Sequence, residues 1–250
     1  MNLLVDVGNS RIKWACQDED GVSPGTGTKY DKLNFAALAH THWGKMASPR
    51  RMLVANVAGG GLGEQISAWV IRRWRITPEF LLPERQAFGV TNAYADPSQL
   101  GADRWACLLA AHHQISGPAC IVDCGTATTI DVLSDTGQHM GGLILPGIQM
   151  MRQSLICNTS QIPGEKLQEN PGTLDLGQST QQAVENGCLY STVATIERVI
   201  SEVTEQLGSA VTTVITGGDT DRVVPLLSID LEQKPDFVLQ GLAIAAGVES

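Results

Sequence analysis

The sequence repeats one short pattern near its start and near its middle. Residues 3–10 (LLVDVGNS) resemble residues 120–127 (CIVDCGTA), with an offset of 117 residues between Asp6 and Asp123. Each copy has a β-rich apolar run, an aspartate, one further residue, a glycine, two small residues and a second β-rich run, which predicts a strand-turn-strand hairpin. An offset of this size is too long for a solenoid repeat, so it indicates two similar α/β lobes, the second starting near residue 115.

Composition limits the classes of protein that the chain can belong to. The 250 residues are 43% hydrophobic and 17% charged, enough to bury a sizeable core, and the formal net charge is −9. This charge disfavours binding to nucleic acid, because the basic clusters are short and the one at residues 72–75 fits the solvated face of a helix. We therefore expect a globular protein that does not bind nucleic acid.

The cysteine pattern and the hydropathy of the sequence indicate the cellular compartment of the protein. The cysteines are scattered singly with no CxxC pair, which is typical of reduced thiols in the cytoplasm. Asp6 interrupts the first apolar run, so a signal peptide is not expected. No apolar run approaches the roughly 20 residues that a spanning helix needs. We expect a cytoplasmic protein that makes no contact with a membrane.

The repeated aspartate and glycine suggest chemistry on a phosphate. A carboxylate at a strand end lies beside the backbone N–H groups of the turn, and glycine lets a phosphate approach them. Asp6 or Asp123 could then hold Mg²⁺, directly or through water. One Asp-x-Gly copy is an ordinary turn, whereas two copies facing each other across a cleft fit a nucleoside triphosphate.

Other glycine-rich segments are less informative. Residues 58–63 (AGGGLG) lack the Lys-Ser/Thr ending of a P-loop and miss the GxGxxG spacing, so a flexible turn is favoured there. Residues 216–219 (TGGD) follow a predicted strand over residues 211–215 and suit either the close approach of an adenosine or a turn with Asp219 as helix N-cap. The five histidines show no metal-ligand spacing.

Asp103 has two interpretations. The apolar spacing predicts a helix over residues 100–113, with Asp103 and Arg104 in its first turn. The acid can simply compensate the helix dipole and form a solvated pair with Arg104. Alternatively, Asp103 accepts the proton of an attacking hydroxyl while Arg104 holds an anionic substrate group. Taken alone, this segment favours the first interpretation.

Four motifs in order resemble those of the type III pantothenate kinases, a family of the actin, sugar-kinase and Hsp70 superfamily. The resemblance spans nearly the full length and reverses the preference at Asp103. The motifs are residues 6–13 (DVGNSRIK), residues 92–94 (NAY) leading into residues 100–104 (LGADR), residues 123–129 (DCGTATT) followed by Gly141-Gly142 and Pro146-Gly147, and residues 177–180 (GQST). Residues 54–59 (VANVAG) depart from the Ser-rich strand that the family usually has, and no site is assigned there.

The resemblance implies a fold and a set of site residues. The implied fold is α/β, with two similar ribonuclease-H-like lobes, mixed sheets with flanking helices and an active-site cleft between the lobes. The expected domains are residues 1–114 and 115–250. Asp103 would be the catalytic base, and pantothenate would contact Tyr94, Gly101, Ala102, Asp103, Arg104 and Thr180. ATP would contact Asp6, Val7, Gly8, Asn9, Ser10, Arg11, Ile12, Lys13 and Thr126, with Mg²⁺ near Asp6 and a monovalent cation, K⁺ or NH₄⁺, at Asp123.

The implied reaction is ATP-dependent phosphorylation of pantothenate to 4′-phosphopantothenate, the first step of coenzyme A biosynthesis, by a homodimer. Two alternatives stay open. One is a kinase on the same fold that acts on another small hydroxyl compound. The other is a nucleotide-binding accessory factor for transcription without catalysis.

Overall fold

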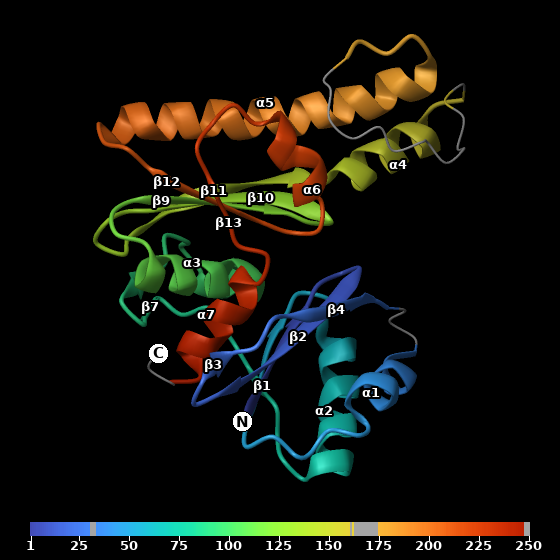
Figure 1. The fold of residues 1–250 in the computed structure, drawn as a ribbon, viewed down its shortest axis with the longest axis vertical. Helices are drawn as coiled ribbons and strands as arrows, with labels where there is room; N and C mark the ends of the chain where they lie inside the picture. Colours follow the sequence, from blue (N-terminus) through green and yellow to red (C-terminus); the bar gives the residue numbers. More distant parts are fainter. Residues whose placement is uncertain (31–33, 161, 163–174, 248–250) are drawn as a thin grey trace. The chain divides into compact units, whose positions relative to one another are not determined.

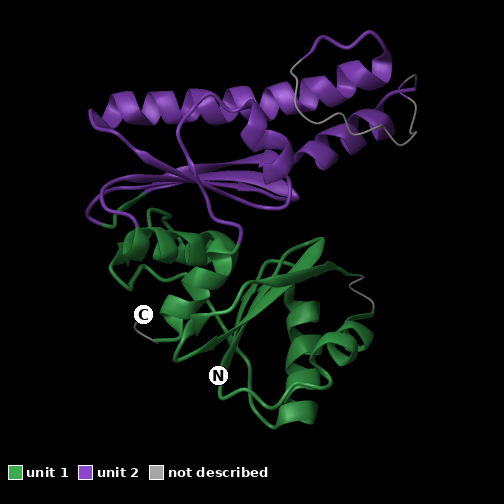
Figure 2. Cartoon of the chain, in the orientation of Figure 1, with its two compact units in different colours: residues 1–114, 137–139, 236–250 green, residues 115–136, 140–235 purple. Residues whose placement is uncertain are grey.

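The chain folds into two compact units. The computed structural model describes residues 1–30, 34–160, 162 and 175–247. Unit 1 comprises residues 1–114, 137–139 and 236–250, and unit 2 comprises residues 115–136 and 140–235 (Figure 2). The expected domain boundary at residue 114 stays a prediction. In the structure two later segments also group with the first lobe: residues 137–139 and the C-terminal segment, whose helix packs on a helix of unit 1.

Unit 1 is built on a mixed sheet with the order β3-β2-β1-β5-β6 and with β4 paired to β2. β1 runs antiparallel to β2 and parallel to β5, with Val7 opposite Ile12 on one side and Asn56 on the other. A separate hairpin, β7-β8, leads towards α3. The strands of unit 1 are β1 (Asn2–Val7), β2 (Arg11–Asp18), β3 (Gly21–Val22), β4 (Thr26–Lys29), β5 (Met52–Asn56), β6 (Glu79–Phe80), β7 (Gln86–Ala87) and β8 (Val90–Thr91).

Unit 2 is built on a second mixed sheet with the order β11-β10-β9-β12-β13. β9 runs antiparallel to β10 and parallel to β12, so Asp123 lies opposite Thr129 on one side and Thr216 on the other. The strands of this sheet are β9 (Ala119–Cys124), β10 (Ala127–Leu133), β11 (His139–Pro146), β12 (Thr212–Thr216) and β13 (Glu232–Gln233).

The two sheets confirm the α/β fold class and the repeated hairpins. In each sheet the first strand of the hairpin is central, its hairpin partner is antiparallel, and the strand on its other side is parallel. Local sequence pattern was sufficient to predict the hairpins because both strands and the turn are contiguous in the chain.

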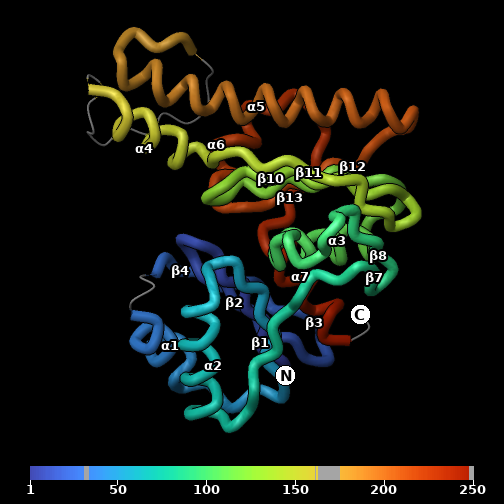
Figure 3. The backbone as a smooth tube through the Cα atoms, turned by 180° about the vertical axis from the view of Figure 1, so that it is seen from behind, coloured from blue at the N-terminus to red at the C-terminus, as the bar shows by residue number. Residues whose placement is uncertain are grey.

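Helices cover the sheets (Figure 1). In unit 1, α1 and α2 lie side by side (Figure 3) and share a core with Leu3, Val5 and Val7 of β1. Leu4 is also fully buried, and because side chains alternate along a strand, the opposite face of the sheet is covered too. In unit 2, Val193 and Ile196 of the long helix α5 pack on the second sheet. The helices are α1 (Phe35–Trp43), α2 (Gly60–Trp74), α3 (Ala102–Gln114), α4 (Ile148–Asn158), α5 (Thr180–Leu207), α6 (Thr220–Val223) and α7 (Phe237–Ala245), with 3-10 turns η2 (Pro97–Gln99) and η3 (Val224–Leu226).

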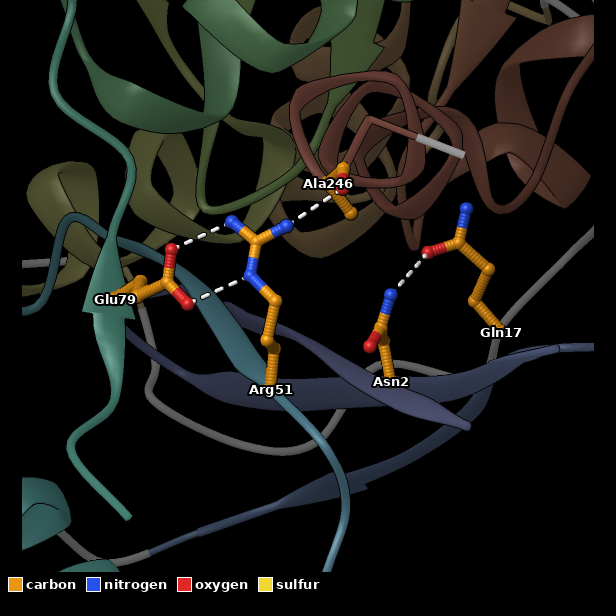
Figure 4. A network of polar contacts seen from close by, with 5 residues as sticks. All are labelled: Asn2, Gln17, Arg51, Glu79 and Ala246. Carbon is orange, nitrogen blue, oxygen red and sulfur yellow. Dashed lines mark hydrogen bonds and ion pairs between the residues drawn. The ribbon is translucent and has the colours of Figure 1, made fainter. Parts of the chain in front are cut away.

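Polar contacts fix the C-terminal helix α7 to unit 1 (Figure 4). The Arg51 guanidinium donates to both carboxylate oxygens of Glu79, at 2.8 and 2.6 Å, and to the carbonyl of Ala246 at 2.6 Å. Gln17, which accepts from the side chain of Asn2 at 3.2 Å, donates to a carbonyl of the same helix, that of Ala243, at 3.2 Å. Gly241 of α7 packs so closely on α3 that a Cβ atom there would collide with the backbone of Ala106.

The glycine-rich segment after β5 differs from the expectation. Instead of a flexible turn, residues 60–63 form the first turn of α2, and Gly59 precedes the helix with φ +102°. A Cβ at Gly63 would lie 3.3 Å from the Asn56 amide and 3.5 Å from Phe80, so the small residue lets the helix pack closely on β5 and β6. Among the described residues, no helix is long and apolar enough to cross a membrane.

Candidate active site

The turn between β1 and β2 presents the first Asp-x-Gly motif. The N–H of Gly8 donates to the carbonyl of Arg11 at 3.0 Å and closes the turn, and Gly8 does not adopt a positive φ. Glycine is therefore not needed there for backbone conformation, and the absence of a side chain leaves the turn open to a ligand. The Tyr30 hydroxyl donates to the Gly8 carbonyl at 2.7 Å, and burial followed by the charge of Asp6 raises the pKa of Tyr30.

The structure brings this turn close to the predicted catalytic base. The Asn9 side chain donates to the carbonyl of Val57 at 3.4 Å. A Cβ on Gly101 would lie 3.6 Å from Cγ1 of Val57 and 2.5 Å from Oδ1 of Asp103. Asn9, Val57, Gly101 and Asp103 therefore form a continuous path within unit 1 from the first phosphate motif to the start of α3.

Asp103 lies in the first turn of α3, where its Oδ1 accepts the backbone N–H of Arg104 at 2.7 Å. This contact fits the interpretation that the acid stabilises the start of the helix. It does not compete with a role as a base, because a carboxylate has further lone pairs that can accept a hydroxyl proton.

A pocket of about 730 Å³ adjoins this region of unit 1. Leu100, Gly101 and Ala102 line one part of it, and Asn56 and Val57 line another. The remaining wall comes from the first turns of α2, from residues 80–83 and from residues 98–99, and the pocket as a whole is largely apolar with a few polar groups. Small-molecule sites commonly have this character. The segment where the sequence departs from the family pattern, and where no site was assigned, therefore lines the pocket.

Tyr94 and Arg104, both predicted from the sequence to contact the substrate, lie in contact with each other. Nη1 of Arg104 donates to the Tyr94 hydroxyl at 2.8 Å, and the guanidinium carbon lies 5.6 Å from the centroid of the tyrosine ring. Arg104 is only 5% exposed. Its planar group is thus held in place beside the start of α3, where it could bind a carboxylate.

Sequence reasoning missed Arg85, which organises the loop that carries Tyr94. The Arg85 guanidinium donates to the carbonyls of Tyr94 at 2.6 Å and Asn92 at 3.3 Å. The Asn92 side chain accepts the N–H of Tyr94 at 3.0 Å, which closes the loop locally. A single arginine before a hairpin carries no recognisable signal in the sequence, and the same is true of Tyr30.

In unit 2, the second motif forms the turn between β9 and β10. The N–H of Gly125 donates to the carbonyl of Ala127 at 3.1 Å, and the carbonyl of Thr126 accepts from the N–H of Gly147 at 3.1 Å. Gly125, like Gly8, does not adopt a positive φ. Both turns place a glycine without positive φ directly after the strand, but the second turn is one residue shorter, and the Pro146-Gly147 motif contacts it.

Asp123 lies at the carboxyl end of β9, beside the glycine turn that follows β12. Gly217 has φ +105°, and a Cβ there would lie 2.5 Å from Oδ1 of Asp123 and would collide with the carbonyl of Cys124. Burial, followed by the charges of Asp123 and Asp219, raises the pKa of Cys124 to about 12. The carboxylates of Asp123 and Asp219 therefore both lie close enough to Cys124 to affect its pKa. Asp219 occupies the N-cap position of α6 without making a capping hydrogen bond.

The donors at the two turns are of the kind that cations prefer. Asp6 and Asp123 supply carboxylate oxygens at strand ends next to backbone groups, and hard cations such as Mg²⁺ or K⁺ bind oxygen ligands. At Gly217 the Asp123 carboxylate and the Cys124 carbonyl pack so closely that a Cβ would collide with both, so glycine is needed there for packing. The residues at both turns therefore fit the expected cations.

Thr180 is exposed at the first position of α5 in unit 2. Ser179 is the N-cap, and its side chain accepts the N–H of Gln182 at 3.2 Å, while Oε1 of Gln182 accepts the N–H of Gln178 at 3.0 Å. The pair is similar to a capping box, except that Gln182 accepts the N–H of Gln178 instead of that of the N-cap Ser179, and it gives the motif a structural purpose.

Comparisons with known proteins give the family of the chain. A type III pantothenate kinase from Nitrosococcus oceani is 41% identical over 98% of this chain and 94% of its own length, and one from Azoarcus sp. (strain BH72) is 37% identical over 100% and 92%. A solved structure from Campylobacter jejuni, described as a Baf family transcriptional activator, covers 98% of both chains at 21% identity with a TM-score of 0.63, which shows a shared fold. The sequence model of the type III pantothenate kinases matches residues 2–202. The chain therefore belongs to the type III pantothenate kinase family.

Proposed function

We propose how the residues of this kinase divide the work of transferring the γ-phosphoryl group of ATP to the primary hydroxyl of pantothenate. The path from Asn9 through Val57 and Gly101 to Asp103 is the observation that carries the proposal. It joins the turn that we propose binds phosphate to the carboxylate that we propose is the base, inside one compact unit, and this supports a role of both in one reaction. The family's reaction, the first step of coenzyme A biosynthesis, needs these two groups together.

Asp103 accepts the proton of the attacking hydroxyl. Phosphoryl transfer passes through a loose transition state, so the hydroxyl proton leaves late and a carboxylate of ordinary basicity is sufficient. The helix start that holds Asp103 also fixes the direction of its carboxylate, since Oδ1 is engaged by the N–H of Arg104. Most of the rate enhancement then comes from positioning.

Pantothenate is held next to Asp103. Its carboxylate pairs with Arg104, which Tyr94 orients through the 2.8 Å hydrogen bond. Gly101 and Ala102 provide a surface without bulky side chains, and the adjoining pocket of about 730 Å³ receives the rest of the molecule. Thr180 adds a hydroxyl contact to the substrate.

Residues 6–13 and Thr126 contact the phosphates of ATP. The turns at Gly8 and Gly125 support this assignment because each follows the end of a strand that carries an aspartate and because glycine puts no side chain in the way of a ligand. Asp6 would hold Mg²⁺, directly or through water, and Asp123 would hold a monovalent cation, K⁺ or NH₄⁺. When bound, these cations supply positive charge that offsets the charge on the transferring group.

We also propose that the protein acts as a homodimer in the cytoplasm, without a nucleic-acid or membrane partner. The support for the location is chemical: all six cysteines are free, as thiols are in a reducing compartment. The support for a dimer is the family resemblance. Sedimentation of the purified protein tests the dimer.

Two assays test the proposed function. The purified protein should release ADP from ATP only when pantothenate is present, and should release it faster with K⁺ or NH₄⁺ than with Na⁺. Mass spectrometry should identify 4′-phosphopantothenate as the product. ADP release that does not depend on pantothenate would contradict the proposed substrate, and activity indifferent to the monovalent cation would contradict the role of Asp123.

The two alternatives raised by the sequence receive less support. The full-length identity of 41% is to a pantothenate kinase and not to a kinase for another hydroxyl compound. The likeness to a transcriptional activator is at 21% identity and shows the fold alone. Duplex DNA binding at physiological salt, with no ADP release, would favour the accessory factor.

A further inference from the structure

A short segment that leads into β11 and includes its first residue forms part of unit 1. Residues 137–139 lie beside the β7-β8 hairpin, where the carbonyl of Gly137 accepts the N–H of Thr91 at 2.9 Å. Gly137 and Gly89 both have positive φ, and a Cβ on either would collide with a neighbour: His112 in the case of Gly89, and the Gly89 carbonyl in the case of Gly137. The close approach that these glycines allow puts the next residues against the loop that carries Tyr94.

His139, the last residue of this segment, lies against Tyr94. It is fully buried, and its ring is stacked on that of Tyr94, with centroids 6.0 Å apart and 19° between the planes. Its Nδ1 also accepts the N–H of Ala93 at 3.5 Å. Tyr94 in turn accepts the hydrogen bond from Arg104. The three side chains His139, Tyr94 and Arg104 therefore form a continuous series that ends at the start of α3.

We propose that His139 is a positioning residue of the pantothenate site, acting through Tyr94 to fix the guanidinium of Arg104. This inference rests on the proposed function, in which Arg104 pairs with the pantothenate carboxylate. Tyr94 is only half-buried, so without a ring behind it the tyrosine would have freedom to turn. Offset stacking restricts that freedom and favours one orientation of the phenol.

The geometry predicts which step of catalysis depends on His139. Arg104 contacts the bound acid and not the transferring phosphoryl group, so a misplaced guanidinium weakens pantothenate binding. ATP contacts come from other residues, namely the hairpin turns. Loss of the His139 ring should therefore raise the KM for pantothenate and leave the KM for ATP nearly unchanged.

Two substitutions at this position separate stacking from simple support of the fold. In His139→Phe the ring remains and the Nδ1 acceptor is lost, so we expect a KM for pantothenate within about threefold of the unsubstituted protein. In His139→Ala the ring is lost, and we expect that KM to rise about tenfold, with the KM for ATP within about twofold. All assays use the full chain, and circular dichroism checks that each variant is folded at the assay temperature.

A matched control is Phe35→Ala. Phe35 is also a fully buried ring of unit 1, but it packs on Trp43 in the core between the sheet and α1. This variant should lose stability and keep the KM for pantothenate. Equal KM changes in Phe35→Ala and His139→Ala, or a tenfold change in His139→Phe, would overturn the positioning role. A failure of the unsubstituted protein to use pantothenate would overturn the proposed function and this inference with it.

Discussion

Nζ of Lys13 lies 3.0 Å from Oδ1 of Asp236, the residue that precedes α7. The other oxygen of this carboxylate accepts the N–H of Gly25 at 2.9 Å. Asp236 thus connects β2, which carries the end of the first phosphate motif, to the C-terminal helix. Residues from the N-terminal and C-terminal parts of unit 1 therefore meet beside the strand that follows the first Asp-x-Gly turn.

Removing this carboxylate should loosen unit 1. In Asp236→Ala the N–H of Gly25 and the ammonium of Lys13 lose an acceptor. Because Lys13 and Asp236 are both partly exposed, the ion pair itself contributes little, and we expect the free energy of unfolding to fall by about 1–2 kcal/mol. Urea unfolding followed by tryptophan fluorescence measures it. Asp230→Ala, at an exposed aspartate, is the control and should be close to neutral. Equal stability of the two variants would show that the contact contributes nothing.

Alanine at the two hairpin glycines should affect ATP more than folding. A Cβ at Gly8 would lie 3.3 Å from the Arg11 carbonyl and one at Gly125 would lie 3.4 Å from Oδ1 of Asp123, so each fits with small adjustments and a cost of about 1 kcal/mol or less. In the proposed function the phosphates approach these two turns, where the methyl group would obstruct them, so we expect the KM for ATP to rise at least about tenfold.

The control for these variants is Gly187→Ala in α5. A Cβ there meets no atom within 4 Å, and alanine in a helix interior should stabilise the protein by up to about 1 kcal/mol. Its KM for ATP should not change. Normal ATP kinetics in both Gly8→Ala and Gly125→Ala would remove the argument that the open turns bind phosphate.

The close packing of α7 on α3 makes Gly241 sensitive. A methyl group there would collide with the backbone of Ala106, which cannot move as a side chain can, so Gly241→Ala should lower the free energy of unfolding by about 1–3 kcal/mol. Thermal unfolding measures the change. An unchanged or raised midpoint would mean that α7 does not pack as described.

Buried thiols should make the protein less stable at alkaline pH. Burial raises the pKa of Cys124 from 9.0 to about 12, so above pH 9 the unfolded chain releases a proton that the folded chain keeps. The unfolded state then binds fewer protons, and stability falls as pH rises from about 9 to about 12. At pH 10 this thiol lowers the free energy of unfolding by about 1.4 kcal/mol relative to its value at neutral pH.

The variant Cys124→Ala isolates this effect. It should be less stable than the unsubstituted protein at pH 7, because a buried sulfur is lost, and the difference should shrink between pH 8 and pH 10. Urea unfolding at each pH measures both curves. Parallel curves would contradict the raised pKa.

Local patterns predicted the parts of the fold that are contiguous in sequence. The hairpins around Asp6 and Asp123 and the helix that carries Asp103 were expected and are present. The first turn of α2 was missed because glycine has a low helix propensity, and packing of Gly63 on β5 and β6 outweighs it. Tertiary packing decides such positions, and it leaves no trace in a single sequence.

The candidate site was predictable where motifs carry it and not where single residues support it. Tyr94 and Arg104 were expected at the substrate and lie together. Arg85 donates to backbone carbonyls, and His139 stacks on Tyr94. Any arginine or histidine could make such contacts, so the sequence does not single these two residues out. In the sequence the histidines show no metal-ligand spacing, and the position of His139 next to Tyr94 depends on Gly89 and Gly137, two glycines far apart in the chain.

The central claim is that Asp103 is the catalytic base, and Asp103→Asn tests it most directly. Asparagine keeps an oxygen that can accept the N–H of Arg104, so the start of α3 should remain intact while the base is lost. We expect kcat for ADP release with pantothenate to fall by a factor of about 10²–10⁴. The affinity for ATP, measured by calorimetry, should stay within about twofold. The control variant Asp20→Asn, at an exposed turn, should be fully active. A kcat for Asp103→Asn within a few fold of the unsubstituted protein would contradict the account.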